Sequence, residues 1–290
     1  MDSKGQSFFS YLLTLVFTGI SLVLSSSLIG TIYSFYSRQT KFKLEDLIQF
    51  YGKNVFFLLQ LFPFVIALFV LLFCVRFIHK QKIKTLFSLK NTFSLKHLFV
   101  SFLLWGILLF LLLLIQFFIL QKPIKWNYSS ESFWILVLIS FFFVGFQTLF
   151  EEILFRGYLL QSFSSFFHKK WIAIIASSLL FGLMHFANPE IKIFGNFILI
   201  YYILTGVFLA LISILDKGIE LAFGFHFVNN LFGTLVLTNN WQVFQTDALF
   251  KDYSKPVLSW EIWISLFIMY PILFYSFKKI YKWKIGEIFA

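Results

Sequence analysis

The sequence is poor in charged residues, cysteine and proline. Only 13% of its 290 residues are Asp, Glu, Lys or Arg, whereas a soluble chain carries roughly a quarter, so polar groups are too few to cover a water-facing surface. The single cysteine, Cys74, excludes an internal disulfide and a cysteine-based metal site. Five prolines and 14 glycines are too few for a collagen-like chain. An ordinary soluble globule and a disordered chain are therefore excluded.

Hydrophobic and basic residues are abundant instead. Hydrophobic residues make up 59% of the chain, and phenylalanine alone occupies 45 positions. The 24 basic residues exceed the 13 acidic ones, which gives a net charge of +11. In a chain this apolar, the excess indicates contact with anionic lipid headgroups rather than with nucleic acid. We therefore expect membrane lipids, and no nucleic acid, among its partners.

Eight long segments contain no Asp, Glu, Lys or Arg. About 20 apolar residues suffice for a helix to cross a hydrocarbon core of about 30 Å. These segments are apolar on all sides and lack the period of two that is typical of barrel strands. We therefore predict an all-α, polytopic membrane protein with eight transmembrane helices. The segments are 5–37, 54–75, 97–121, 132–150, 171–189, 193–215, 221–246 and 262–277.

The ends of these segments refine the prediction. The first is too long for the apolar part of a signal peptide and lacks a small-residue cleavage site, so we expect a retained helix. The last is adequate if residues 257–260 extend it and Glu261 lies near the interface. Residues 41–53 have helical spacing of apolar residues, which predicts a short helix on the membrane surface.

The distribution of basic residues predicts the orientation. With eight spans, the side that holds both termini carries 15 Lys and Arg residues, and the opposite side carries nine. The positive-inside rule therefore places both termini in the cytoplasm.

An acidic pair interrupts the apolar pattern at the end of the fourth span. No Gly or Pro separates Glu151 and Glu152 from the preceding run, so the helix should continue through them. Glu152 and Arg156 are spaced i,i+4 and predict an ion pair, whereas Glu151 points about 140° away from the arginine. One carboxylate is thus neutralised and the other is free.

Two more polar groups fall in later spans. Phe181 and His185 share one helix face near the end of the fifth span, and His226 and Asn230 share one face within the seventh. Ionisable groups at membrane depth are costly unless they are paired or face water. Together with Glu151, these side chains predict a reaction centre in a polar intramembrane cavity. A carboxylate can take a proton from water, while imidazole and amide groups can donate to an oxyanion, which favours a hydrolase.

These three ordered motifs, Glu-Glu-x-x-x-Arg, Phe-x-x-x-His and His-x-x-x-Asn, resemble those of the CPBP family. This family is also called the Abi or CAAX-protease and bacteriocin-processing family, and its eukaryotic relative is the Rce1-type prenyl protein peptidase. The resemblance implies an intramembrane, glutamate-dependent endopeptidase. It covers about residues 130–240, within a peptidase core at 97–290. Residues 1–96 would hold two membrane helices and basic interfacial connections.

The resemblance also implies a role for each motif residue. Glu151 would activate the water with help from His185, and His226 and Asn230 would stabilise the oxyanion. Glu152, Arg156 and Phe181, which belong to the same motifs, would be supporting residues. No cofactor is implied.

Two questions stay open from the sequence. Zinc held by Glu151, His185 and His226 is an alternative to a metal-free site, although a paired Glu152 and an asparagine would be poor ligands. For the function, we expect cleavage of a peptide or a membrane-proximal protein tail, in peptide maturation or bacteriocin self-immunity, at a bacterial plasma membrane. The alternatives are a non-proteolytic scaffold, immunity protein or sensor-kinase modulator, and a transporter. The sequence gives no oligomeric state.

Overall fold

The computed structural model describes residues 7–90, 92–257 and 260–288, apart from the side chains of Glu261 and Glu287. The first half contains Phe8–Ser37 (α1), Leu44–Tyr51 (α2), Lys53–Phe77 (α3), Ile83–Leu86 (η1), Leu95–Leu114 (α4), Ile115–Ile119 (η2), Ile124–Trp126 (β1), Ser130–Ile139 (α5) and Ser140–Val144 (η3). Next come Gly145–Glu152 (α6), Ile153–Leu159 (η4), Leu160–Phe167 (α7), Lys170–Met184 (α8), Pro189–Phe194 (α9) and Phe197–Asp216 (α10). The remainder is Glu220–Leu231 (α11), Phe232–Val236 (η5), Leu237–Thr238 (β2), Phe250–Asp252 (β3), Trp260–Ile264 (α12), Ser265–Met269 (η6), Tyr270–Tyr281 (α13) and Ile285–Ile288 (η7).

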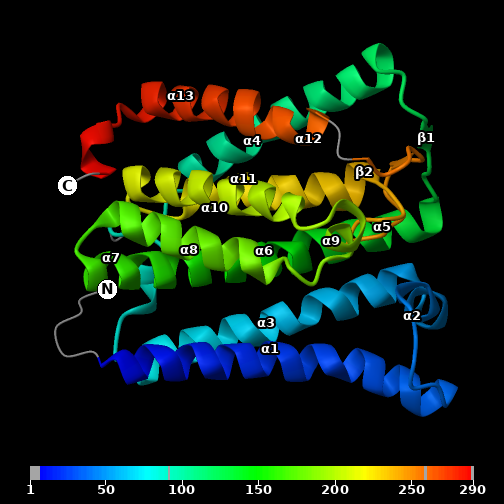
Figure 1. Ribbon diagram of the computed structural model, residues 1–290, viewed down its shortest axis with the longest axis horizontal. Coiled ribbons are helices and arrows are strands. Elements are labelled where there is room, and N and C mark those ends of the chain that lie inside the picture. Colours follow the sequence, from blue (N-terminus) through cyan, green and yellow to red (C-terminus); the bar gives the residue numbers. More distant parts are fainter. Residues whose placement is uncertain (1–6, 91, 258–259, 289–290) are drawn as a thin grey trace.

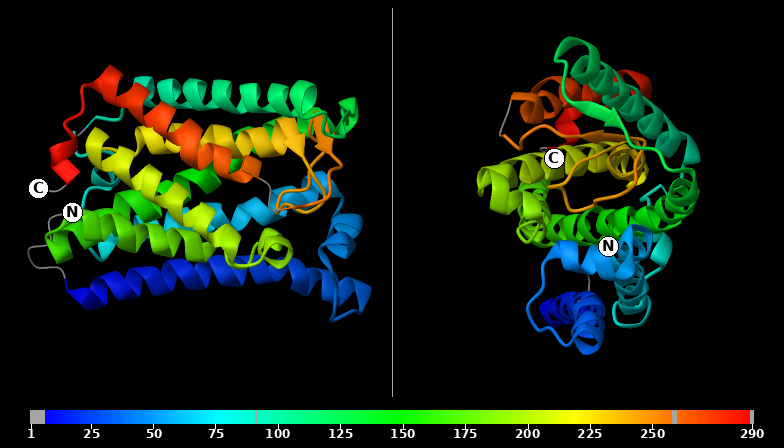
Figure 2. Two further views of the ribbon diagram at one scale, coloured as in Figure 1. Left: turned by 45° about the horizontal axis from the view of Figure 1, so that its top comes forward. Right: turned by 90° about the vertical axis from the view of Figure 1, so that its right-hand side faces the viewer.

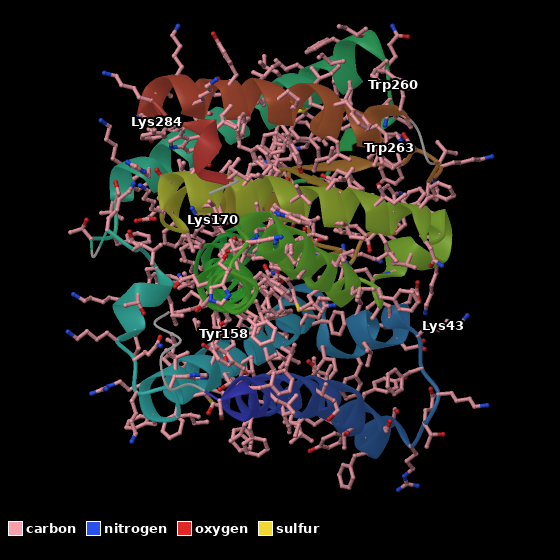
Figure 3. All side chains as sticks on the ribbon, turned by 60° about the vertical axis from the view of Figure 1, so that its left-hand side comes forward. Lys43, Tyr158, Lys170, Trp260, Trp263 and Lys284 are labelled. Carbon is pink, nitrogen blue, oxygen red and sulfur yellow. The ribbon has the colours of Figure 1, made fainter. Side chains whose placement is uncertain are left out.

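The long helices lie side by side along the longest axis of the molecule (Figure 1). Helices α1 and α3 pack on each other as a layer at one side, and the end-on view in Figure 2 shows this layer beside the rest of the bundle. Helix α1 begins at the same end of the bundle at which α13 finishes (Figure 1). Lys43 and Lys284 lie toward opposite ends in Figure 3.

The surface is apolar, as a lipid environment requires. In α1 the buried residues are Thr14, Thr18 and Tyr33, whereas Phe9 and Phe35 are exposed. This burial pattern is the reverse of that in a water-soluble helix, because the polar side chains face the protein interior and the apolar side chains face outward. Among the described residues, five helices are long and apolar enough to cross a membrane: Phe8–Ser37, Lys53–Phe77, Leu95–Ile119, Ser130–Phe167 and Phe197–Asp216.

Eight spans are not confirmed by this count. The helix at the fifth predicted span, α8, has 15 residues, which is short for a full crossing. The seventh predicted span, 221–246, is wrong at its C-terminal end, because the helix stops at Val236 and the chain turns into β2. The eighth corresponds to α12 through α13, and its predicted extension at 257–260 lies partly outside the described residues, as does the side chain of Glu261.

The prediction of an all-α protein is wrong in one respect. A three-stranded sheet has the order β1-β3-β2, with β1 and β3 antiparallel and β2 and β3 parallel. Its strands are two or three residues long, too short to produce a period-two signal in the sequence. The chain is nevertheless mostly helical, and the predicted surface helix within 41–53 is present as α2.

Two glycines allow the helices around the site to approach closely. A Cβ atom on Gly224 of α11 would lie 2.2 Å from the carbonyl oxygen of Leu98 in α4. A Cβ atom on Gly182 of α8 would lie 2.3 Å from Cγ1 of Ile203 in α10. Small residues permit such backbone contact between membrane helices, and here they fix the positions of the two helices that carry the predicted histidines.

Candidate active site

The acidic pair lies inside one continuous helical stretch, as predicted. Residues 130–167 are helical throughout, with π-helical turns at η3 and η4 on either side of α6. Such turns place an extra residue in the helix and are frequent at functional sites. Glu151 and Glu152 are the last two residues of α6, and both side chains are almost completely buried.

Glu152 is neutralised by Arg156, and this predicted ion pair is present. Nη1 of Arg156 donates to Oε1 of Glu152 at 2.8 Å, and both side chains are buried. The guanidinium also donates from Nη2 to the carbonyl oxygen of Gly206 at 3.4 Å. Its carbon atom lies 4.3 Å from the centre of the Phe181 ring, a cation–π contact. Phe181 therefore contacts the arginine, and it is not among the residues that line the cavity described below.

Glu151 has a different environment from its neighbour. Nε2 of Gln147, one turn earlier, donates to Oε1 of Glu151. Oε2 of Glu151 is buried and has no hydrogen-bond partner among the described residues. The nearest cationic candidate is Nε2 of His226, 3.7 Å from that oxygen. The free carboxylate predicted from the helix geometry is thus held by one hydrogen bond and has one oxygen available.

Helix α11 contributes His226 and Asn230 to the same place. Nδ1 of His226 lies 2.7 Å from Oε1 of Glu152, so the ring donates to the oxygen that also accepts from Arg156. Nδ2 of Asn230 donates to Oε1 of Gln147 at 3.0 Å. Gln147 therefore bridges Asn230 and Glu151.

His185 lies at the C-terminal end of α8, where the helix finishes. Its Nδ1 is 2.9 Å from the carbonyl oxygen of Phe181, so the N–H on Nδ1 donates to the backbone and Nε2 is left as an acceptor. The ring stacks on Tyr202 of α10 at 4.2 Å between ring centres. Among the described residues His185 makes no hydrogen bond to Glu151, but both side chains line the cavity described next.

A cavity of about 480 Å³ is lined by all four predicted catalytic residues. Its wall also includes Gln60 and Ser26 from the layer formed by α1 and α3. Further lining residues come from α9 and from the loop after β2, and these elements lie at the end of the bundle away from the start of α1 (Figure 1). The lining consists of Leu22, Ser26, Ile29, Gln60, Phe64, Gln147, Glu151, Met184, His185, Asn188, Glu190, Tyr201, Tyr202, His226, Asn229, Asn230, Gly233, Gln242, Val243 and Phe244.

The zinc alternative was tested on the donor atoms. Within residues 7–90, 92–257 and 260–288, no three His, Cys, Asp or Glu side chains converge as a metal-binding group. Nδ1 of His185 is bonded to a backbone carbonyl, and Nδ1 of His226 is bonded to Glu152. These contacts leave Nε2 of both rings outside them, as in histidines that bind zinc, but the side chains of Glu151, His185 and His226 do not come together as a metal-binding group among the described residues.

Gln147 and Glu190 are two polar residues of the cavity that were missed in the sequence analysis. Gln147 is a polar residue inside an apolar run, one helical turn before Glu151, and this spacing was the available signal. Glu190 is a buried carboxylate that follows the fifth predicted span, and only its proximity to His185 along the chain pointed to the site.

The comparison with known families concerns the segment that carries these residues. Residues 130–232 match the family model described as type II CAAX prenyl endopeptidase Rce1-like. The resemblance seen in the motifs is confirmed. The Rce1-like segment begins with α5, ends at Phe232 and contains all seven predicted catalytic and supporting residues. The Rce1-like match and the apolar helices together identify an integral membrane protein.

One curated relative gives the extent of similarity outside that segment. The chain is 28% identical over 171 residues to the uncharacterized protein YyaK of Bacillus subtilis (strain 168). The aligned region covers 59% of this chain and 57% of YyaK, so it spans little more than half of the relative. No solved structure matches the chain.

Proposed function

We propose that the protein is an intramembrane endopeptidase of the CAAX-processing type, in which Glu151 activates water. The single observation that supports this most is the environment of Glu151: a buried carboxylate with one unpartnered oxygen, 3.7 Å from an imidazole nitrogen, in the wall of a cavity. An unpaired acid at such a position is costly, and a functional task explains why it is present.

Each step of hydrolysis has a residue suited to it. Oε2 of Glu151 takes a proton from water as the water oxygen attacks the carbonyl carbon of the scissile bond. The Nε2 atom of His185 can accept a hydrogen bond from the same water. When the tetrahedral intermediate collapses, the carbon–nitrogen bond breaks and the protonated Glu151 returns its proton to the leaving amine.

The oxyanion of the intermediate would be stabilised from α11. Nδ1 of His226 already donates to Glu152, so Nε2 can donate only when the ring is an imidazolium. The two carboxylates beside it, with Arg156 as the other cation, would then balance the charge of the cluster. Asn230 supplies a neutral N–H donor one turn away on the same face.

The substrate would be a peptide or a membrane-proximal protein tail, in peptide maturation or bacteriocin self-immunity. We propose eight spans in the bacterial plasma membrane with both termini in the cytoplasm, in accordance with the positive-inside rule. The polar cavity would then open toward the outer face, because α9 and the loop after β2, which contribute to its lining, lie at the opposite end of the bundle from the start of α1 and the end of α13 (Figure 1).

The test is cleavage of a peptide library by the full-length protein in proteoliposomes, read by mass spectrometry. Wild type should cleave, and Glu151→Gln and His226→Ala should not. Glu131→Gln is the matched control, since Glu131 is an exposed carboxylate outside the cavity lining. Cleavage that survives Glu151→Gln would refute the mechanism. Activity lost with a chelator and restored by zinc would favour the metal alternative.

A cellular assay tests the scaffold alternative. Protection or signalling that is unchanged by both Glu151→Gln and His226→Ala would assign a non-proteolytic role. Loss of the cellular effect with both variants, at unchanged protein abundance, would support the peptidase.

A further inference from the structure

A second carboxylate, Glu190, lines the cavity that contains Glu151. It is the second residue of α9, directly after Pro189, whose fixed backbone angle suits the first turn of a helix. The short helix follows the end of α8, so Glu190 lies a few residues beyond His185. Its side chain is 8% exposed, so it is a buried charge at the wall of the cavity rather than a surface residue.

One oxygen of Glu190 is used by the protein and the other is not. The backbone N–H of Val243, in the loop after β2, donates to Oε1 of Glu190 at 3.0 Å. Oε2 is buried and has no hydrogen-bond partner among the described residues. A buried carboxylate oxygen without a partner is unfavourable, so a ligand that supplies a donor there would be bound with a gain in free energy.

The charges around the cavity favour a cationic ligand. The described lining residues include two carboxylates, Glu151 and Glu190, and no lysine or arginine. The charge of Glu151 is balanced within its own cluster by His226 and Arg156, so Glu190 gives this wall its negative charge. The chain as a whole has a net charge of +11, so this wall is locally opposite in sign to the protein. A concave site lined by charge of one sign attracts ligands of the other sign. The rings of Tyr201 and Tyr202 line the same cavity, and Tyr202 is stacked on His185.

We propose that Glu190 is a specificity-determining residue that binds a cationic group of the substrate, a Lys or Arg side chain or a peptide N-terminal ammonium. This inference rests on the proposed function and deepens it, since it assigns basic peptides as the substrate class. Oε2 accepts the charge-assisted hydrogen bond from the cation, while Oε1 remains on Val243.

Binding to the cleavage-deficient Glu151→Gln variant tests the proposal without catalysis. The probes are fluorescent peptides of one sequence with lysine or norleucine at a central position, each with a free or an acetylated N-terminus. Adding Glu190→Gln should weaken binding of the lysine peptide by about tenfold or more and leave the norleucine peptide within about twofold. If the N-terminal ammonium is the bound group, Glu190→Gln will instead weaken binding of the peptides with a free N-terminus and leave binding of the acetylated peptides unchanged. Glu131→Gln should change neither affinity.

A charge reversal separates recognition from a purely structural role of Glu190. Glu190→Lys should bind a glutamate-containing peptide more tightly than the lysine peptide, provided that its melting temperature shows a folded protein. Equal binding of cationic and neutral peptides by the Glu151→Gln variant, before any change at Glu190, would overturn the proposal. Glu151-dependent cleavage without preference for basic peptides would also overturn it while leaving the proposed peptidase intact. Charge-selective binding in a protein that cleaves no peptide would support the cation-binding site and refute the proposed peptidase.

Discussion

Nδ1 of His226 lies 2.7 Å from Oε1 of Glu152, the same oxygen that accepts from Arg156 at 2.8 Å. One carboxylate oxygen therefore orients the imidazole and neutralises the guanidinium. Glu151, the adjacent residue in the chain, is hydrogen-bonded neither to His226 nor to Arg156. Its Oε2 atom has no hydrogen-bond partner among the described residues. Adjacent glutamates thus have separate environments, one in an ion-paired cluster and one with an unpartnered oxygen.

The first prediction follows from this division. Glu152→Gln should destabilise the protein by about 3–5 kcal/mol, because it leaves the buried charge of Arg156 without its partner. Glu151→Gln should keep the melting temperature of the wild type and lose only activity. Thermal unfolding in one detergent, followed by circular dichroism, measures both. Equal melting temperatures for the two variants would contradict the assignment.

The second prediction concerns Asn230. Asn230→Ala should lower kcat by about 100-fold, since it removes a donor that the oxyanion requires, and should leave KM within about twofold. Gln147→Leu should also lower kcat, because Gln147 donates to Glu151 and accepts from Asn230. Steady-state kinetics on the best peptide distinguish the effects. A raised KM with unchanged kcat would assign Asn230 to substrate binding.

The third prediction is a pH dependence of stability at His79, which follows the end of α3. Nε2 of His79 faces the hydroxyl groups of Thr14 at 3.0 Å and Tyr158 at 2.9 Å, and Figure 3 labels Tyr158 in the interior. Burial lowers the pKa of His79 from its ordinary value of 6.5. The unfolded chain then binds the proton more strongly than the folded protein does. The contribution of neutral His79 to the stability of the fold is therefore complete above pH 6.5 and is lost as pH falls through the folded pKa.

Melting temperatures between pH 7.5 and pH 5 measure this effect. The wild type should lose stability toward low pH, and His79→Gln, which keeps a group able to bond to hydroxyls, should lose it less steeply. Parallel curves for the two proteins would show that other groups control the pH dependence.

The fourth prediction compares two glycines near the C-terminal half of the bundle. Gly224→Ala should destabilise the protein by about 1–3 kcal/mol, because the new methyl group meets the backbone of Leu98 and forces α11 away from α4. Gly233→Ala is the control, since a Cβ atom there meets nothing within 4 Å. It should be neutral or stabilise by up to about 1 kcal/mol. Urea titrations in mild detergent would reveal either outcome, and similar midpoints for both variants would refute the close-contact argument.

The fifth prediction concerns orientation. Cysteines introduced at the exposed positions Asn240 and Lys282 lie near the cavity end and the C-terminal end, and native Cys74 is buried and should not react. In intact cells, an impermeant maleimide should label Asn240→Cys and spare Lys282→Cys. The opposite pattern would mean that the cavity opens to the cytoplasm.

The sequence predicted what depends on spacing within one helix. Glu152 and Arg156 had to pair because four residues make one helical turn, and α2 had to be helical because Leu44, Leu47 and Ile48 recur at that period. Long-range outcomes were not predicted. The contact of His226 with Glu152 joins residues 74 positions apart, and no local pattern carries that information.

Helix ends and short strands were predicted least well. The seventh span seemed to continue to residue 246 because loop residues such as Trp241, Val243 and Phe244 are apolar. In the structure Val243 and Phe244 line the cavity instead, and the backbone N–H of Val243 donates to Glu190. Hydropathy cannot distinguish an apolar residue that faces lipid from one that faces a cavity.

The small sheet has a mechanical consequence for the chemistry. β1 leads into the helical stretch that carries Glu151, β2 leaves the one that carries His226, and β3 pairs with both. The sheet therefore links the two helical stretches beyond their ends, so it can restrict how far Glu151 and His226 move apart. Substitutions in β3, which lies outside the cavity lining, should then lower any Glu151-dependent cleavage by allowing a wider separation of the two side chains.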